Sequence, residues 1–193
     1  MRNLNETELM SAIAADDEAA FVELLRRHQD LVYGTVYKML GQHVADAEDV
    51  AQQVFIKVYR AAPRYRPEAK FTTWLLTICR NCTFTHLKRG KRRPTHPLSY
   101  EDDEGTHETI PPDPEALPAD QILLHREMQN KVEAAVARLP LNQREALVLR
   151  QYHQLDYEEI ARVMKTSVSS VKSLLFRARD VLRQELKGYL DAK

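Results

Sequence analysis

Two cysteines and a histidine could bind a metal ion or carry out redox chemistry. Cys79 and Cys82 are separated by two residues, and His86 follows four residues later, so the three fall on one face of a predicted helix. A C-x-x-C pair followed by histidine resembles part of a zinc or thiol site. The sequence offers no second cysteine pair and no obvious fourth ligand, and small thiols pack well in helical cores. We therefore expect core packing here, with no metal and no cofactor.

A second group of residues could read DNA bases. The segment from Tyr157 to Leu175 is typical of two helices joined by the polar turn Lys165–Ser167, which predicts a helix-turn-helix. Leu174 could join the core or touch a thymine methyl group. The outward residues of the second helix, expected to contact bases and phosphates in the major groove, are Ser169, Ser170, Lys172, Ser173, Phe176 and Arg177. The alternative is a helical hairpin with a solvated basic face.

Aromatic and basic side chains alternate in the first half of the chain. The rings are those of Tyr59, Tyr65, Phe71, Trp74 and Phe84, and between Lys57 and Arg93 eleven basic residues accompany one acid. This mixture suits single-stranded DNA, because bases stack on rings while the backbone follows a positive track. The residues favoured for DNA contact are Arg80, Asn81, Lys88 and Arg89. Phe71 and Trp74 could belong to the core instead, and residues 88–93 could be a solvated helix end.

The formal charge is zero, but it is unevenly distributed. Residues 101–120 hold eight acids and no lysine or arginine, whereas seven bases outnumber two acids in residues 162–187. Two basic segments therefore flank an acidic one, and basic clusters are the electrostatic footprint of phosphate binding.

Helical periodicity and only five glycines predict an all-α chain. The first helices are expected at residues 6–15, 18–40, 46–60 and 72–88, with Asp46 as the N-cap of the third. Later helices should start at Asn142 and Asp156, each with glutamate three residues on, which is the capping-box spacing. Six prolines and many acids in residues 94–118 predict a flexible linker. We expect two small helical domains, 1–93 and 120–193, joined by the acidic linker 94–119.

Several classes of protein are disfavoured. No apolar run approaches the roughly 20 residues that cross a bilayer, and Met1–Leu9 has no apolar core of a secretion signal. Two cysteines supply no disulfide framework. We expect a cytoplasmic protein without membrane insertion.

Three segments together resemble the extracytoplasmic-function sigma factors of the sigma-70 superfamily. They are DAEDVAQQVFIKVYRA (residues 46–61), FTTWLLTICRNCTFTHLKR (71–89) and LPLNQREALVLRQYHQLDYEEIARVMKTSVSSVKSLLFRARDVL (139–182). The resemblance covers nearly the whole chain in the right order. It implies a non-enzymatic sigma factor with a region 2 bundle and a region 4 helix-turn-helix, which directs core RNA polymerase to promoters.

The resemblance also implies partners and roles for individual residues. Asp49, Gln52 and Gln53 would face the β′ clamp of polymerase, and region 4 would dock on the β flap. The loop from Arg64 to Lys70, including Tyr65 and followed by Phe71, would capture a flipped base of the single-stranded −10 element beside Arg80 and Asn81. The predicted recognition helix would read the double-stranded −35 element. An anti-sigma factor is a further expected partner, and no stable homo-oligomer is expected.

Two other classes of protein share parts of this sequence pattern. A ligand-controlled helix-turn-helix regulator that acts without polymerase would need a dimer interface and a ligand pocket. An enzyme built around Cys79 and Cys82 would need a phosphate loop, an acidic metal cluster or a nucleophile with its base, and the sequence contains no such motif. We therefore favour the sigma factor.

Overall fold

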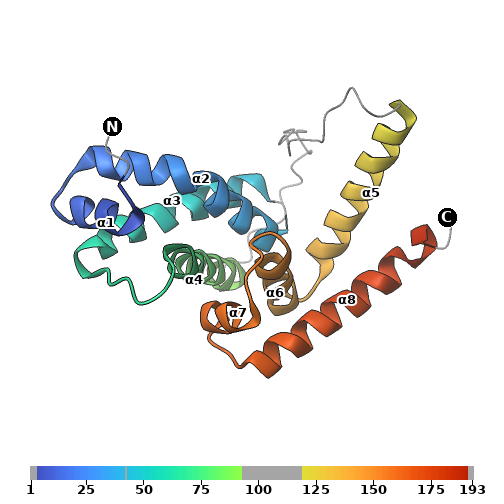
Figure 1. Ribbon diagram of the computed structural model, residues 1–193. Coiled ribbons are helices and arrows are strands. Elements are labelled where there is room, and N and C mark those ends of the chain that lie inside the picture. Colours follow the sequence, from blue (N-terminus) through green and yellow to red (C-terminus); the bar gives the residue numbers. More distant parts are fainter. Residues whose placement is uncertain (1–3, 42, 93–118, 191–193) are drawn as a thin grey trace.

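The computed structural model describes residues 4–41, 43–92 and 119–190, and every regular element in these ranges is helical (Figure 1). The helices are α1 (Glu6–Ala14), α2 (Glu18–Leu40), α3 (Val44–Ala61), the 3-10 turn η1 (Ala62–Arg64), α4 (Phe71–Arg92), α5 (Ala119–Arg138), α6 (Leu141–Gln151), α7 (Tyr157–Met164) and α8 (Val168–Leu190). The predicted all-α fold is confirmed. Residues 94–118 of the predicted linker lie outside the described residues. Within the described ranges, no helix has the length and apolar character needed to cross a membrane.

The boundaries of α1 and α2 follow from local capping. Asn5 accepts a hydrogen bond from the backbone N–H of Glu8, whose side chain accepts one from Asn5 in return, so α1 begins with a capping box. Asp17 caps α2 through the backbone N–H of Ala20. The helix ends at Gly41, whose φ of 73° lies in the left-handed region that glycine adopts without strain. Helix α2 has the predicted bounds, and α1 ends at Ala14, one residue before the predicted end.

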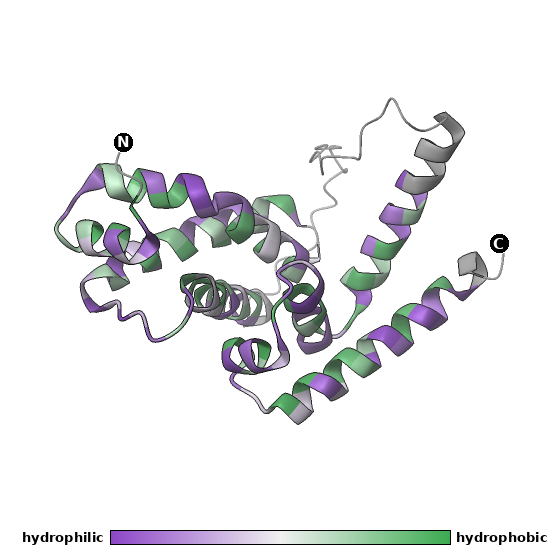
Figure 2. Ribbon diagram, viewed as in Figure 1, coloured by the Kyte–Doolittle hydropathy of each residue, from purple (hydrophilic) through white to green (hydrophobic). Residues whose placement is uncertain are grey.

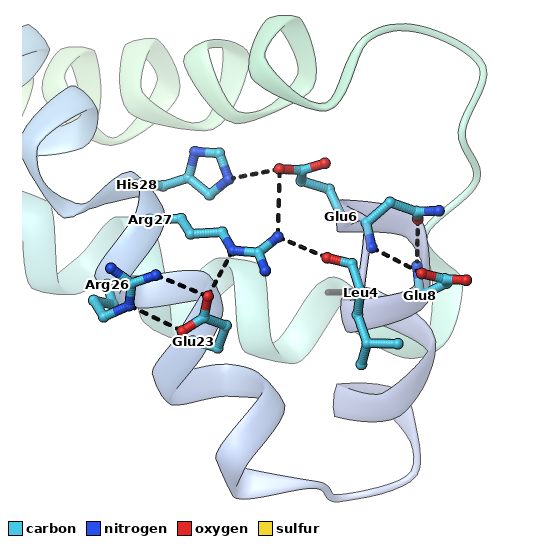
Figure 3. A network of polar contacts seen from close by, with 8 residues as sticks. Leu4, Glu6, Glu8, Glu23, Arg26, Arg27 and His28 are labelled. Atoms are coloured by element: carbon cyan, nitrogen blue, oxygen red, sulfur yellow. Dashed lines mark hydrogen bonds and ion pairs between the residues drawn. The ribbon is translucent and has the colours of Figure 1, made fainter. Parts of the chain in front are cut away.

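Arg27 connects the start of α1 to α2 (Figure 3). Its Nη1 donates to the backbone carbonyl of Leu4 at 2.7 Å, and its Nε donates to Glu23 Oε1 at 2.8 Å. His28 lies beside it, with Nε2 3.6 Å from Glu6 Oε1. The pKa of His28 is lowered, chiefly because burial disfavours the charged ring. The contacts fix the short first helix against the second.

Two predicted helix starts are wrong. Helix α3 begins at Val44 after His43, so Asp46 lies in the first turn and is not the N-cap. Helix α6 begins at Leu141 after Pro140, so Asn142 lies inside it and Glu145 makes no capping contact. Pro140 occupies the N-cap position with an extended ψ of 138°, so the helix starts one residue before Asn142. A carboxylate in the first turn is also favourable without capping, because it lies near the positive helix end.

The predicted capping box of α7 is confirmed. Glu159 N donates to Asp156 Oδ1 at 2.7 Å, and Asp156 N donates to Glu159 Oε2 at 3.1 Å. Both bonds satisfy backbone donors that the first helical turn leaves free.

The apolar residues form separate clusters. One unites α1–α4 around residues such as Leu24, Val32, Val54 and Leu75, each of which contributes about 1.5–3 kcal/mol when fully buried. A second joins α6, α7 and α8, and a third joins α5, α6 and α8. Figure 2 shows hydrophobic and hydrophilic residues interleaved along α8, as expected for a helix with one buried face.

The N-terminal helices (α1–α4) and the C-terminal helices (α5–α8) are in contact. Helix α7 packs on α4, and α6 packs on α2. Figure 1 shows α6 and α7 beside α2 and α4, while α5 and α8 extend away from them. The second cluster accordingly includes Leu76 of α4.

Candidate nucleic-acid interface

Helices α7 and α8 form the predicted helix-turn-helix. Lys165 turns the chain with a φ of 52°, a left-handed conformation unusual for a residue other than glycine. Ser167 Oγ then accepts a hydrogen bond from Ser170 N at 3.1 Å and caps α8. Ile160 and Ala161 of α7 are buried with Val171 and Leu175 of α8. A polar turn therefore replaces the usual glycine, and a shared core fixes the two helices.

The outward face of α8 is polar, basic and aromatic. Ser169, Lys172, Ser173 and Arg177 are exposed, Ser170 is half-buried, and Phe176 is 72% exposed. A phenylalanine this exposed is costly in water, which favours a partner surface. Leu174 instead packs against the second cluster. All six predicted recognition residues therefore share the side of α8 that avoids the core.

A basic pocket opens where η1 meets α3 and α4. Its volume is about 320 Å³, and its lining residues are Lys57, Arg60, Ala61, Arg64, Tyr65, Arg66 and Trp74. The rings of Tyr65 and Trp74 meet edge to face with centroids 4.9 Å apart. The pocket combines four cations with two aromatic walls, which are the groups that hold a flipped base and its phosphates.

In the structure, some of the predicted −10 residues lie at the pocket and others lie along α4. Arg64 and Tyr65 line the pocket. Phe71 is 8% exposed and packs against Tyr65, so it supports the pocket from the core. Asn81, Lys88 and Arg89 are exposed along α4. From Phe71 to Arg89 the helix extends for about 27 Å, so these side chains form a track and not one site.

Two of the predicted −10 cations contact the C-terminal helices. Lys70 Nζ lies 2.9 Å from Glu159 Oε1, and Arg80 Nε lies 2.7 Å from Glu145 Oε1. The Glu145 side chain is fully buried, and that of Arg80 is 19% exposed. Arg80 also stacks over the Phe84 ring, with Cζ 4.4 Å from the centroid. These two cations therefore already have carboxylate partners.

The two carboxylates differ electrostatically. Burial raises the pKa of Glu145 to about 7, even though Arg80 acts in the opposite direction. The pKa of Glu159 is lowered, mainly by Lys70, and the pKa of Lys70 is raised by the same contact. Glu159 is thus a stable anion, whereas Glu145 is held in an environment that disfavours its charge.

The predicted clamp residues lie on one exposed face of α3. Asp49, Gln52 and Gln53 are exposed, and Ile56, which continues the same row, is 41% exposed. Val54 and Val58 point the other way into the core. The face is therefore polar with an apolar residue at its end.

The cysteine pair lies in the core. Cys79 is fully buried, Cys82 is 5% exposed, and burial raises the pKa of the Cys79 thiol. His86 is separate, with Nε2 3.3 Å from Asp46 Oδ1. In the part of the chain that the structure describes, no group of histidine, cysteine and acidic residues could hold a metal ion. A buried, protonated thiol is a poor ligand and nucleophile.

The structure adds residues to the predicted site groups. Lys57, Arg60, Arg66 and Trp74 join the pocket, and Ile56 joins the α3 face. A sequence signal existed for part of this set, because Lys57, Arg60 and Arg64 recur at helical spacing. The wall supplied by Trp74 depends on how α4 packs against η1, which spacing alone does not show.

A helix-turn-helix with a basic outward face and a separate basic, aromatic pocket define an all-helical DNA-binding protein. Residues 24–93 match the model of Sigma-70 region 2, and residues 129–182 match that of Sigma-70 region 4. The chain is 34% identical over 189 residues to the RNA polymerase sigma-H factor of Pseudomonas aeruginosa, covering 96% of this chain and 95% of that protein. It is 32% identical to the ECF RNA polymerase sigma-E factor of Haemophilus influenzae, covering 95% and 96% of the two chains. The chain belongs to the extracytoplasmic-function (ECF) sigma factors of the sigma-70 family.

Solved structures share the fold. The chain resembles the sigma factor RpoE of Bartonella quintana, solved in complex with the anti-sigma factor NepR, with a TM-score of 0.63 and 20% identity over 86% of this chain and 96% of that one. It also resembles CnrH, solved in complex with the cytosolic domain of CnrY, with a TM-score of 0.61 and 22% identity over 97% and 98% of the two chains.

Proposed function

We propose that this sigma factor joins core RNA polymerase and directs it to promoters by reading the −35 element as a duplex and the −10 element as a single strand. The observation that carries the proposal is that one chain has both the basic outward face of α8 and the separate basic, aromatic pocket. Family membership favours this function over a ligand-controlled regulator. We further propose that the protein acts in the cytoplasm and is not itself an enzyme.

The outward face of α8 suits the −35 duplex. Its first two turns present serine hydroxyls and Lys172, and Arg177 follows one turn later. Hydroxyls, lysine and arginine are the usual donors to base edges and phosphates in the major groove. Phe176 supplies apolar contact, either to a thymine methyl group or to the polymerase.

The pocket suits one flipped base of the −10 strand. Tyr65 and Trp74 supply rings for stacking, while Lys57 and Arg60 would hold the adjoining phosphates. Lys70 and Arg80 would join this contact, and Asn81, Lys88 and Arg89 would continue it along α4. Phe71 acts indirectly in this proposal, because it is buried behind Tyr65.

The exposed face of α3 suits the polymerase clamp. Asp49, Gln52 and Gln53 offer acceptors and donors, and Ile56 supplies an apolar contact. Interfaces of this kind combine a dry apolar centre with a polar rim. Region 4 would dock separately on the β flap.

Further elements of the proposal concern organisation and partners. We propose domains at 1–93 and 120–193 joined by the linker 94–119, and a monomer in the free state. An anti-sigma factor is a proposed partner because the fold matches that of RpoE, which was solved with such a factor.

Reconstitution with core RNA polymerase tests the function. The purified chain should form a complex with core enzyme and should start transcripts at discrete positions across a genomic DNA library. If the mixture starts only the transcripts that core enzyme makes alone, the proposal is wrong.

A further inference from the structure

The contact between the N-terminal and C-terminal helices covers part of the proposed −10 surface. Lys70 pairs with Glu159 of α7, and Arg80 pairs with Glu145 of α6. A lysine or arginine that holds a carboxylate cannot present the same donors to a phosphate. The two glutamates therefore occupy the places that DNA phosphates would take on these cations.

An apolar contact supports the two ion pairs. Leu75 and Leu76 are neighbours on α4 and point in different directions, since Leu75 lies in the cluster of the N-terminal helices and Leu76 in that of α6–α8. Leu76 is 1% exposed and belongs to the same cluster as Ile160 and Ala161. Leu31 of α2 packs against the same cluster. The helix-turn-helix thus uses α4 as part of its own core.

Polar contacts extend the same interface to the end of α2. Arg144 Nη1 donates to the carbonyl of Met39 at 3.0 Å, and Thr35 Oγ1 lies 2.7 Å from His153 Nε2. Lys38 Nζ stands 4.2 Å over the Tyr152 ring. Residues from α2 and α4 therefore contact α6, α7 and the turn between them along a continuous surface.

A chain bound to both promoter elements cannot keep the contact between its N-terminal and C-terminal helices. Elements separated by two turns of the double helix lie about 70 Å apart, whereas Lys70 and Glu159 are in contact. The first helix of the helix-turn-helix cannot reach −35 DNA while it lies on a residue proposed to contact −10 DNA.

We propose that this contact is an autoinhibitory closure, in which Glu145 and Glu159 of region 4 occupy Arg80 and Lys70 of region 2 and must release them before the −10 strand can bind. The inference rests on the proposed function, since it needs Lys70 and Arg80 to contact DNA. The competing ligand is a single-stranded nucleic acid, whose phosphates would bind the two cations.

The ion pairs are suited to a contact that opens. Arg80 Nε and Glu145 Oε1 are 2.7 Å apart, yet neither atom has a hydrogen-bond partner of good geometry among the described residues. Burying charges without further hydrogen bonds removes much of the gain from pairing them. Lys70 is 75% exposed, so its pair with Glu159 is also weak. A phosphate strand can therefore displace both carboxylates.

Zero-length cross-linking tests the closure in the full chain. A carbodiimide joins a lysine amine to a carboxylate only when the two are in contact, as Lys70 and Glu159 are. Mass spectrometry of the monomer should find this cross-link. A single strand of about 12 nucleotides, at saturation, should lower its yield by about fivefold or more, because the strand binds only open molecules. Absence of the cross-link, or its occurrence only in dimers, overturns the proposal, as does a yield that the strand leaves unchanged.

Adjacent glutamates provide a matched pair of variants. Glu159→Gln removes the charge but keeps the capping box, which accepts glutamine. Glu158→Gln removes the same charge from the exposed neighbour. Glu159→Gln should bind the labelled strand more tightly than Glu158→Gln does, with equal thermal stability. Equal affinities for the two variants contradict the proposal.

Leu76→Ala should have the larger effect. Leu76 lies in the cluster of α6–α8, so its truncation weakens the closed contact without changing any charge, and the apparent affinity for the strand then rises by about tenfold or more. Far-ultraviolet circular dichroism checks that the variant is folded. If the variant is not folded, the cross-link in the unchanged chain and the comparison of Glu159→Gln with Glu158→Gln still test the closure.

The cross-link and the transcription assay together distinguish a failure of the closure from a failure of the sigma-factor function. A chain that starts promoter-specific transcripts with core polymerase, but forms no Lys70–Glu159 cross-link, disproves the closure alone. A chain that forms the cross-link but starts no such transcripts disproves the sigma-factor function.

Discussion

At the scale of the residue, the two glutamates of region 4 have different roles although both pair with a cation. Glu159 completes the capping box of α7 and so stays ionised and fixed. Glu145 has no capping role and is buried against Arg80. Its carboxyl group is therefore the one whose protonation responds to the closed contact.

The pH dependence of closure follows from the pKa of Glu145. Burial in the closed chain raises that pKa from its ordinary value of 4.5 to about 7, so exposure of the carboxyl group on opening weakens its hold on the proton. The contribution of Glu145 to closure is fully present below its open-state pKa and is lost as the pH rises through about 7. Energy transfer between dyes on Gln53→Cys and Gln184→Cys should report this loss.

The control for that measurement is Glu145→Gln in the same labelled chain. His153 titrates in the opposite sense, because burial and Lys38 lower its pKa and its protonation weakens the contact as the pH falls. The difference between the two chains isolates Glu145. An identical pH profile with and without Glu145 would contradict the assignment.

Arg177 gives a residue-scale test of promoter reading. Arg177→Ala should weaken use of the promoter by about 1–3 kcal/mol if the guanidinium binds a base edge. Arg183→Ala removes the same charge six residues further along α8 and should have a smaller effect. Transcription from a mapped promoter measures both, and equal losses would argue for a general electrostatic contribution.

At the scale of the element, capping decides how firmly the helix-turn-helix is held. Helix α7 has only eight residues, so the bonds at its start are a large part of its stabilisation. The turn that follows relies on Lys165 in a left-handed conformation and on the Ser167 cap.

Removal of the N-cap should therefore be measurable. Asp156→Ala should lower the free energy of unfolding by about 0.5–2 kcal/mol, because the backbone N–H of Glu159 loses its acceptor. Urea unfolding followed by circular dichroism gives the value. Glu158→Ala, at an exposed position in the same turn, should change it by much less.

The exposed face of α3 makes an element-scale prediction for polymerase. Asp49→Ala should weaken binding of core enzyme by about 1–2 kcal/mol without changing thermal stability, because Asp49 is exposed and lies outside the core. Glu48→Ala is the matched control on the neighbouring face. Normal binding of core polymerase by Asp49→Ala would make the clamp assignment wrong.

At the scale of the whole molecule, the distribution of charge has a consequence beyond DNA binding. Lys70, just before α4, and Arg80 of α4 meet acids from α7 and α6, so the chain neutralises part of the surface that we propose binds the −10 strand. The same residues would serve closure in the free protein and contact with DNA in the initiation complex.

Polymerase should therefore compete with closure. Docking of region 2 on the clamp and of region 4 on the flap would separate Lys70 from Glu159, so added core enzyme should suppress their carbodiimide cross-link. Bovine serum albumin at equal mass is the control for nonspecific quenching. A cross-link that persists in the purified complex would show that closure and polymerase binding are compatible.

The sequence by itself determined much of the local structure. Periodicity and the Asp156–Glu159 spacing predicted α2 and α7, because helix ends depend on groups a few residues apart. The same local reasoning failed at Asp46 and at Asn142, where helices start earlier than the capping rule indicates. At these two helix starts, helix propensity and the neighbouring residues favour different first residues, and the differences in free energy are small.

Only the tertiary structure decided which side chains meet. The sequence marked Lys70 and Arg80 as candidates for DNA contact, but it did not pair them with Glu159 and Glu145, which lie far along the chain. The same limit applies to Trp74, which the fold places in the pocket wall. Spacing along a helix reports which face a residue occupies, whereas the partner of that face depends on how separate helices pack, and that is set by the whole buried surface.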